Sequence, residues 1–274
     1  MAATLERLNQ EKRKALVPFI TAGDPDLEVT RGLIFEMEKQ GADIIELGIP
    51  FSDSLADGPT IQRSFVRALE KGFSLKKILK MVADVRKQTE IPIILMTCYN
   101  LVFRYGKEKF LKDAVAAGVD GLIIPDLPVE ETRQLQPNSH DNTPDLIYLL
   151  APTSTNKRIE LVSKASQGFI YYISVAGITG ERKKLPREIG EKIRIIKTNS
   201  SLPVLVGFGI STPEQAKDAA KVSDGVIIGS AIVRIIEEAG GNKKKRLSSV
   251  GKFVKKVRLA LDQKKTAFKK EGDF

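Results

Sequence analysis

Eight short apolar runs, separated by segments with helical spacing, are the feature that most restricts the fold of this chain. The runs are LVPFIT (16–21), DIIELGIP (43–50), IPIILMTC (91–98), GLIIPDLP (121–128), LIYLLAP (146–152), GFIYYIS (168–174), LPVLVGFG (202–209) and DGVIIGSA (224–231). Continuous Val, Ile and Leu runs, rather than strict alternation, are typical of parallel strands covered by helices. Several intervening segments end in Gly-Ala or Gly-Val before the next run, as helices often do. The pattern therefore predicts eight β-α units.

Eight such units in 274 residues predict an α/β fold of the TIM (β/α)8 barrel type. We expect residues 1–274 to form a single domain, with an extra N-terminal helix and an extra helix after the second strand. That second helix is predicted from Pro59, a favoured first helical residue, through about Leu69. The long connection after the sixth run, residues 175–190, is interpreted as a mobile flap. A doubly wound sheet is the alternative, and length alone also allows two domains.

The basic charge of the chain is concentrated at its C-terminal end. Residues 241–274 hold 12 Lys and Arg against 3 Asp and Glu, a net charge of +9 that leaves +1 for residues 1–240. Apolar residues at helical spacing predict that this tail is an amphipathic helix with a solvated basic face. A basic arm for nucleic acid is the weaker alternative, because it rests on the tail alone and the body is nearly neutral.

The strand ends exclude two kinds of aldol chemistry. In a TIM barrel the active site lies at the carboxyl ends of the strands. None of the eight predicted ends carries the lysine that a Schiff-base mechanism needs. Metal-dependent chemistry would ordinarily use histidine, and the only histidine, His140, lies in a polar loop. Cys98 is interpreted as a small side chain that fills the barrel, and we expect no metal site.

Carboxylates and tyrosines remain as proton-transfer groups. Glu46 lies within the second run, so a position facing the barrel interior would desolvate it and raise its pKa toward the range useful for acid/base work. Asp57 follows in a loop that ends in Gly-Pro, where it could equally cap the next helix. Tyr171 and Tyr172 are adjacent on the sixth run, so at most one of them faces the interior.

The last two strand ends predict a phosphate site. Gly207, Gly209 and Gly229-Ser230 follow the seventh and eighth runs, where bare backbone N–H groups can approach an anion. We expect the substrate to be a small phosphate ester. An apolar wall for a ring or chain would come from four residues: Phe19, Met96, Ile123 and Phe208.

These residues resemble the tryptophan synthase α-subunit family. The matching motifs, in the family's order, are P-F-I-T-A-G-D-P (18–25), E-L-G-I-P-F-S-D-x-x-A-D-G-P-x-I-Q (46–62), Y-N-L-V-F-R-Y-G (99–106), P-D-L-P-V-E-E (125–131), A-G-I-T-G (176–180) and G-F-G-I-S (207–211). The resemblance implies reversible retro-aldol cleavage of indole-3-glycerol phosphate to indole and glyceraldehyde 3-phosphate.

The resemblance also implies site residues. Glu46 matches the catalytic glutamate that moves protons between the glycerol hydroxyl and indole C3, and Asp57 matches the aspartate that accepts the indole N–H. Tyr171 matches the active-site tyrosine, and Thr179 lies in the flap that closes over substrate. The phosphate cradle of the family matches Gly180, Gly209, Gly229 and Ser230.

The resemblance implies a partner as well: a pyridoxal-phosphate β subunit in an α2β2 tetramer, with no cofactor on this chain. The Asp53 loop and residues 99–105 match surfaces that meet this partner. Ser54 and Val175 depart from the family pattern, and the tail is longer and more basic; these departures bear on coupling to the partner more than on the chemistry.

Two further functions stay open, a free-standing indole-glycerol-phosphate lyase and a non-catalytic regulator of a β-like enzyme. Three features of the sequence predict a cytoplasmic protein that is not in the membrane. The chain has a single cysteine, its start lacks a signal-peptide pattern, and it lacks an apolar run near the roughly 20 residues that span a bilayer.

Overall fold

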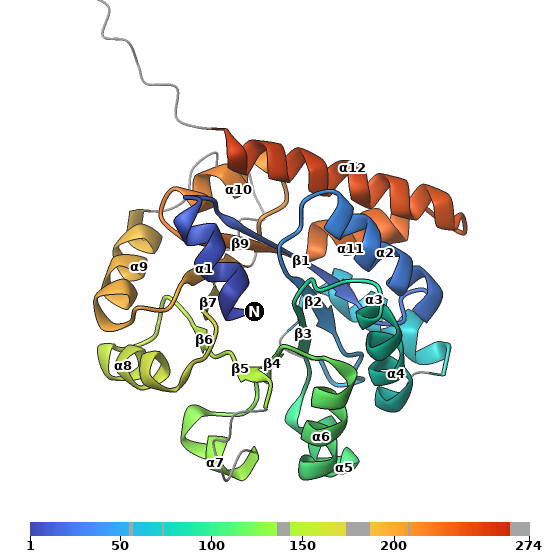
Figure 1. Cartoon of the computed structure of the whole chain (residues 1–274), viewed down its shortest axis with the longest axis horizontal. Coiled ribbons are helices and arrows are strands. Elements are labelled where there is room, and N and C mark those ends of the chain that lie inside the picture. Colours follow the sequence, from blue (N-terminus) through green and yellow to red (C-terminus); the bar gives the residue numbers. More distant parts are fainter. Residues whose placement is uncertain (55–56, 73, 136–142, 174–186, 208, 264–274) are drawn as a thin grey trace, which may run out of the picture.

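A curled parallel sheet, surrounded by helices, forms the centre of the molecule (Figure 1). The structure is a computed structural model, and it describes residues 1–54, 57–72, 74–135, 143–173, 187–207 and 209–263. Its strands are β1 Ala15–Thr21, β2 Ile45–Gly48, β3 Ile93–Met96, β4 Gly121–Ile123, β5 Asp145–Leu146, β6 Leu149–Leu150, β7 Ile170–Ile173, β8 Val204–Gly207 and β9 Gly225–Ile228. Each of these strands lies within or at the edge of one of the eight apolar runs.

The sheet closes on itself through the fifth run. The strand order is β5-β4-β3-β2-β1-β9-β8-β7-β6, and every pairing between neighbours is parallel. β5 pairs with β4 and β6 pairs with β7, with only Ile147 and Tyr148 between β5 and β6. One run thus joins both edges of the sheet, which makes the TIM barrel that the sequence predicts.

Helices lie outside the sheet, with one exception. The outer helices are α2 Leu27–Lys39, α3 Pro59–Glu70, α4 Leu75–Arg86, α5 Tyr99–Tyr105, α6 Lys107–Ala117, α7 Thr132–Leu135 with the short 3-10 turn Val129–Glu131 before it, α8 Asn156–Ala165, α9 Arg187–Asn199, α10 Pro213–Ala220, α11 Ser230–Glu238 and α12 Lys243–Asp262. The extra helix predicted after the second strand is α3, with Pro59 as its first residue.

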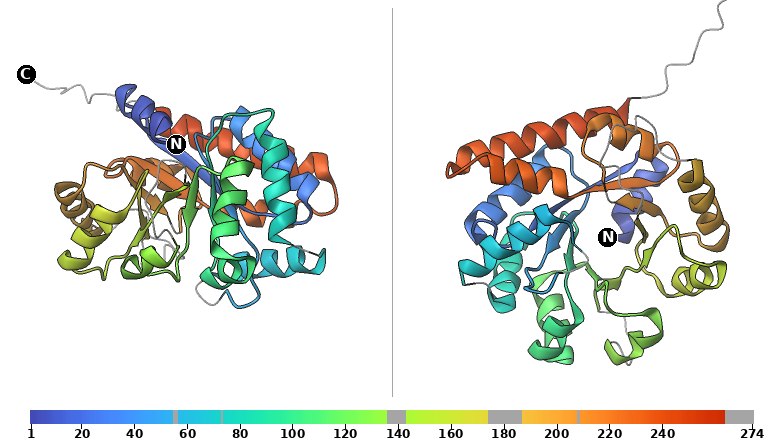
Figure 2. Two further views of the ribbon diagram at one scale, coloured as in Figure 1. Left: turned by 60° about the horizontal axis from the view of Figure 1, so that its bottom comes forward. Right: turned by 180° about the vertical axis from the view of Figure 1, so that it is seen from behind.

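The exception is the extra N-terminal helix α1, Ala2–Gln10, which covers one end of the barrel (Figure 2). Leu5 and Leu8 of α1 are buried in the cluster that fills the barrel interior. The strand and loop residues of that cluster are Ala15, Val17, Ile44, Ile94, Ile123, Ile147, Phe169, Tyr171, Leu205 and Ile227. Because α1 packs against the start of β1, it lies at the amino ends of the strands, and the carboxyl ends remain for the site.

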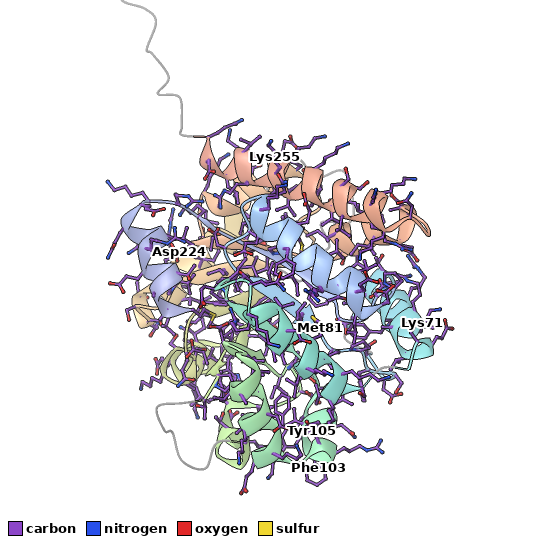
Figure 3. The ribbon with its side chains drawn as sticks, turned by 45° about the vertical axis from the view of Figure 1, so that its right-hand side comes forward. Lys71, Met81, Phe103, Tyr105, Asp224 and Lys255 are labelled. Atoms are coloured by element: carbon purple, nitrogen blue, oxygen red, sulfur yellow. The ribbon has the colours of Figure 1, made fainter. Side chains whose placement is uncertain are left out.

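Within the basic tail, Lys243–Asp262 form helix α12, which packs on α2, α10 and α11. Val250, Val254 and Val257 face inward and are buried, whereas the basic side chains exemplified by Lys255 project outward (Figure 3). Arg258 is the buried exception, and its guanidinium donates to the Asp43 carboxylate at 3.0 Å. α12 is therefore an integral outer helix of the barrel. No helix in the described ranges has the length and apolar character needed to cross a bilayer.

Candidate active site

Glu46 lies on β2 with its side chain in the barrel interior. It pairs in register with Phe19 on β1 and with Ile94 on β3. The residue is fully buried, and neither carboxyl oxygen has a hydrogen-bond partner among the described residues. An ionised carboxylate is costly in such surroundings, so burial raises the pKa of Glu46 to about 8, with a smaller contribution from the negative charge of Asp57. Glu46 is therefore mostly protonated at neutral pH.

This raised pKa predicts a pH-dependent stability. Between a pKa of 4.5 in the unfolded chain and about 8 in the folded one, the folded state binds more protons than the unfolded state. The free energy of unfolding should therefore fall as the pH rises through this interval, by on the order of 4 kcal/mol. The Glu46→Gln variant lacks the titration, so its stability relative to wild type should increase with pH. Urea unfolding of both proteins at several pH values measures the difference, and parallel pH curves would contradict the prediction.

Asp57 lies in the connection between β2 and α3. The residue is half-buried, and burial raises the pKa of its carboxyl group. Its backbone N–H donates to the carbonyl oxygen of Ser54 at 3.1 Å. The charge of Asp57 acts on both Glu46 and Tyr171, so the structure brings these three predicted groups together at one place.

Tyr171 on β7 points into the barrel, whereas its neighbour Tyr172 packs among the outer helices. A Cβ atom at Gly207, on the adjacent β8, would lie 2.4 Å from the Tyr171 hydroxyl oxygen, so this close approach requires glycine. Burial, and then the charges of Glu46 and Asp57, raise the pKa of Tyr171 well above its ordinary value. The phenol therefore keeps its proton and can donate a hydrogen bond.

Three of the four residues predicted to form an apolar wall, Phe19, Met96 and Ile123, lie in the described part of the structure. The Phe19 ring lies over Gly48, where a Cβ atom would be 2.4 Å from the ring. Ile123 is buried in the interior cluster, and Met96 is half-buried beside it. Phe19 also packs with residues from α3 and α11, namely Ile61, Phe65 and Val233. Because Phe19 pairs in register with Glu46, a surface suited to a flat apolar ring adjoins this residue.

The predicted anion site lies at the start of α11. Gly229 precedes this helix, Ser230 is its exposed first residue, and no side chain caps the helix in the described structure. Gly209, exposed after β8, has a φ of +80°. An uncapped helix N-terminus presents backbone N–H groups to an anion. The other residues predicted for binding, Thr179, Gly180 and Phe208, lie outside the described residues.

Two of the remaining candidates, Asp53 and Cys98, lie in the described residues. Asp53 is exposed and accepts a hydrogen bond from the Ser52 hydroxyl at 3.0 Å. Cys98 is half-buried before α5, and burial raises the pKa of its thiol. His140 and Val175 lie outside the described residues. Within the described ranges, no group of three or more His, Cys, Asp and Glu is placed to hold a metal ion.

Gln62 was missed by the sequence reasoning. Its side-chain amide, in the first turns of α3, donates to the carbonyl oxygens of Ser54 and Asp57 at 3.1 and 3.0 Å. The available signal was its place as the last residue of the acid-rich motif of residues 46–62.

Comparisons with known proteins identify the family of this chain. The sequence profile of the family described as "Tryptophan synthase alpha chain" matches residues 5–262. The tryptophan synthase alpha chain of Geotalea uraniireducens is 52% identical over 243 residues, which cover 89% of this chain and 91% of that protein. The chain from a Thermoanaerobacter species is 46% identical over 256 residues, covering 93% of this chain and 97% of the other.

Solved structures give the same result. The crystal structure of tryptophan synthase subunit alpha from Legionella pneumophila has a TM-score of 0.87 at 40% identity and covers 95% of this chain and 97% of that one. A chain of the tryptophan synthase complex from Pyrococcus furiosus has a TM-score of 0.79 at 34% identity, covering 89% of this chain and 98% of that one.

The barrel and these similarities define a TIM-barrel lyase that breaks a carbon–carbon bond. Its substrate is indole-3-glycerol phosphate, which it cleaves in the biosynthesis of tryptophan. The chain belongs to the tryptophan synthase alpha chain family. The pyridoxal phosphate of the complete synthase is carried by the β subunit.

Proposed function

We propose that Glu46 performs the proton transfers of this cleavage. The observation that carries the proposal is a fully buried carboxyl group with both oxygens unpartnered in the described structure. With a pKa of about 8, Glu46 holds its proton at neutral pH and can donate it to indole C3. The resulting indolenine is an electron sink. Glu46, now ionised, then takes the proton of the glycerol hydroxyl as the carbon–carbon bond breaks, so the reaction returns it to its protonated form.

Asp57 and Tyr171 would stabilise the charges that develop. A carboxylate at Asp57 would accept the indole N–H and stabilise the positive charge that C3 protonation places on the ring. Tyr171 would donate a hydrogen bond from a phenol that stays neutral. The negative charge of Asp57 acts on both Glu46 and Tyr171, which supports a shared role around one substrate.

The substrate would bind between the apolar wall and the start of α11. The indole ring would contact Phe19, Met96 and Ile123, and the phosphate would meet the backbone N–H groups beside Gly229 and Ser230. Gly209, and outside the described residues Thr179, Gly180 and Phe208, would complete this part of the site.

We also propose that the chain works with a tryptophan synthase β subunit in an α2β2 tetramer. The surface that supports this is α5, where the labelled Phe103 side chain lies at the surface (Figure 3) and is 63% exposed. Its ring lies 6.4 Å from that of Tyr99. Exposed aromatic residues are enriched in protein interfaces. The loop that carries Asp53 would meet the β subunit and couple its binding to the active site. The single-domain arrangement of residues 1–274 and the cytoplasmic location remain predictions.

Indole release by the purified chain, with and without a purified β subunit, tests this proposal. We expect marked activation by the partner, and we expect Phe103→Ala to weaken it, raising the β-subunit concentration for half-maximal activation roughly tenfold or more. Leu259→Ala is the matched control, because Leu259 is 56% exposed on the distant helix α12. Equal activity with and without the partner would indicate a free-standing lyase.

A further inference from the structure

The amide of Gln62 joins the two ends of the turn that carries Asp57. Its Nε2 atom donates to the Ser54 carbonyl at 3.1 Å and to the Asp57 carbonyl at 3.0 Å. The Ser54 carbonyl also accepts the Asp57 N–H at 3.1 Å. Because both neighbours of the amide are acceptors, its NH₂ group must face them, and each of its two hydrogens serves one carbonyl.

The helix that carries Gln62 is itself held firmly to the barrel. On α3, the Ser64 hydroxyl lies 2.6 Å from the hydroxyl of Thr21, the last residue of β1, and both side chains are buried. One turn later, Arg67 binds both carboxyl oxygens of Asp24 at 2.8 and 2.7 Å, and Asp24 is 1% exposed. The Gln62 amide therefore extends from a fixed support to the turn.

We propose that Gln62 is a positioning residue that fixes Asp57 for the reaction. The hydrogen bonds of Gln62 reach the backbone of the turn, which leaves the Asp57 carboxyl group free to meet the substrate. Among the hydrogen bonds of the described residues, the turn without them would keep its own Asp57-to-Ser54 bond, and small displacements of a catalytic group reduce rates strongly. This inference rests on the proposed role of Asp57.

Two substitutions remove the donors while keeping the length of the side chain. Gln62→Met is expected to lower kcat about 10- to 100-fold with KM within about threefold of wild type, because the substrate still binds but Asp57 is misplaced. Gln62→Glu keeps the shape and presents a carboxylate that cannot donate, so it should be at least as slow at neutral pH. Glu70→Met, at an exposed position of the same helix, is the matched control and should keep full activity.

A double-mutant cycle shows whether Gln62 acts through Asp57. In an Asp57→Asn background, Gln62→Met should change kcat by no more than about threefold, because there is no carboxylate left to position. Thermal unfolding midpoints of all variants distinguish a loss of activity caused by a misplaced Asp57 from a general loss of fold. The same loss in both backgrounds, or full activity of Gln62→Met or Gln62→Glu, would overturn this inference alone. Full activity of Asp57→Asn would overturn the proposed role of Asp57 and this inference with it.

Discussion

Replacing Glu46 by Gln should lower indole release from indole-3-glycerol phosphate by about a thousandfold. The amide of glutamine has nearly the shape of the protonated carboxyl group, but it cannot take up or release a proton near neutral pH. A positioned proton-transfer group contributes about 10²- to 10⁴-fold to the rate. Because Glu46 is proposed to serve both the hydroxyl and C3, we expect a loss well above the lower end of this range. Steady-state indole release at neutral pH, with and without the β subunit, measures it.

Substrate binding and fold serve as controls for this variant. Binding of indole-3-glycerol phosphate should remain within about tenfold of wild type, because the apolar wall and the anion site are untouched. Glu160→Gln makes the same chemical change at an exposed position of α8 and should keep full activity. A Glu46→Gln protein with more than about a tenth of wild-type activity would contradict the proposed proton transfers. A variant that is inactive but still activates the β subunit would show that regulation is separable from catalysis.

Most of the barrel could be predicted from the sequence because both faces of its strands are buried. The side chains that fill the barrel interior pack on one face of the sheet and the outer helices pack on the other, so each strand is a continuous apolar run. The fifth run is the exception in detail, since Ile147 and Tyr148 separate β5 from β6. That split depends on which neighbour each half pairs with, which is a property of the closed sheet and leaves no local pattern in LIYLLAP.

Glu46 could be found from the sequence, because a carboxylate within an apolar run is conspicuous whatever the family. The role of Asp57 could not be derived in this way, since a loop aspartate before Gly-Pro is equally suited to a helix cap, and that role came from the resemblance. In the structure, Gly58 is the residue before α3, and no side chain of the described residues caps this helix. Gln62 and the close approach of Gly207 to Tyr171 depend on contacts between separate elements, so no periodicity indicated them.

The Asp57→Asn variant should lose about 10²- to 10³-fold in indole release, because the neutral amide cannot stabilise the positive charge on the indolenine, and removal of a comparable stabilising group costs this much elsewhere. The matched control is Asp84→Asn, because the Asp84 side chain on α4 is 42% exposed. The loss should fall mainly on kcat, since the charge develops after binding.

The same substitution should also move the pH dependence of the remaining activity. The negative charge of Asp57 is one cause of the raised pKa of Glu46, so its removal should lower that pKa below about 8. The decline in kcat/KM that accompanies deprotonation of Glu46 should then begin at a lower pH in Asp57→Asn than in wild type. A pH profile of kcat/KM for both proteins measures the displacement. A decline at the same pH in both would show that the two carboxyl groups do not interact in the working enzyme, even if the rate falls as expected.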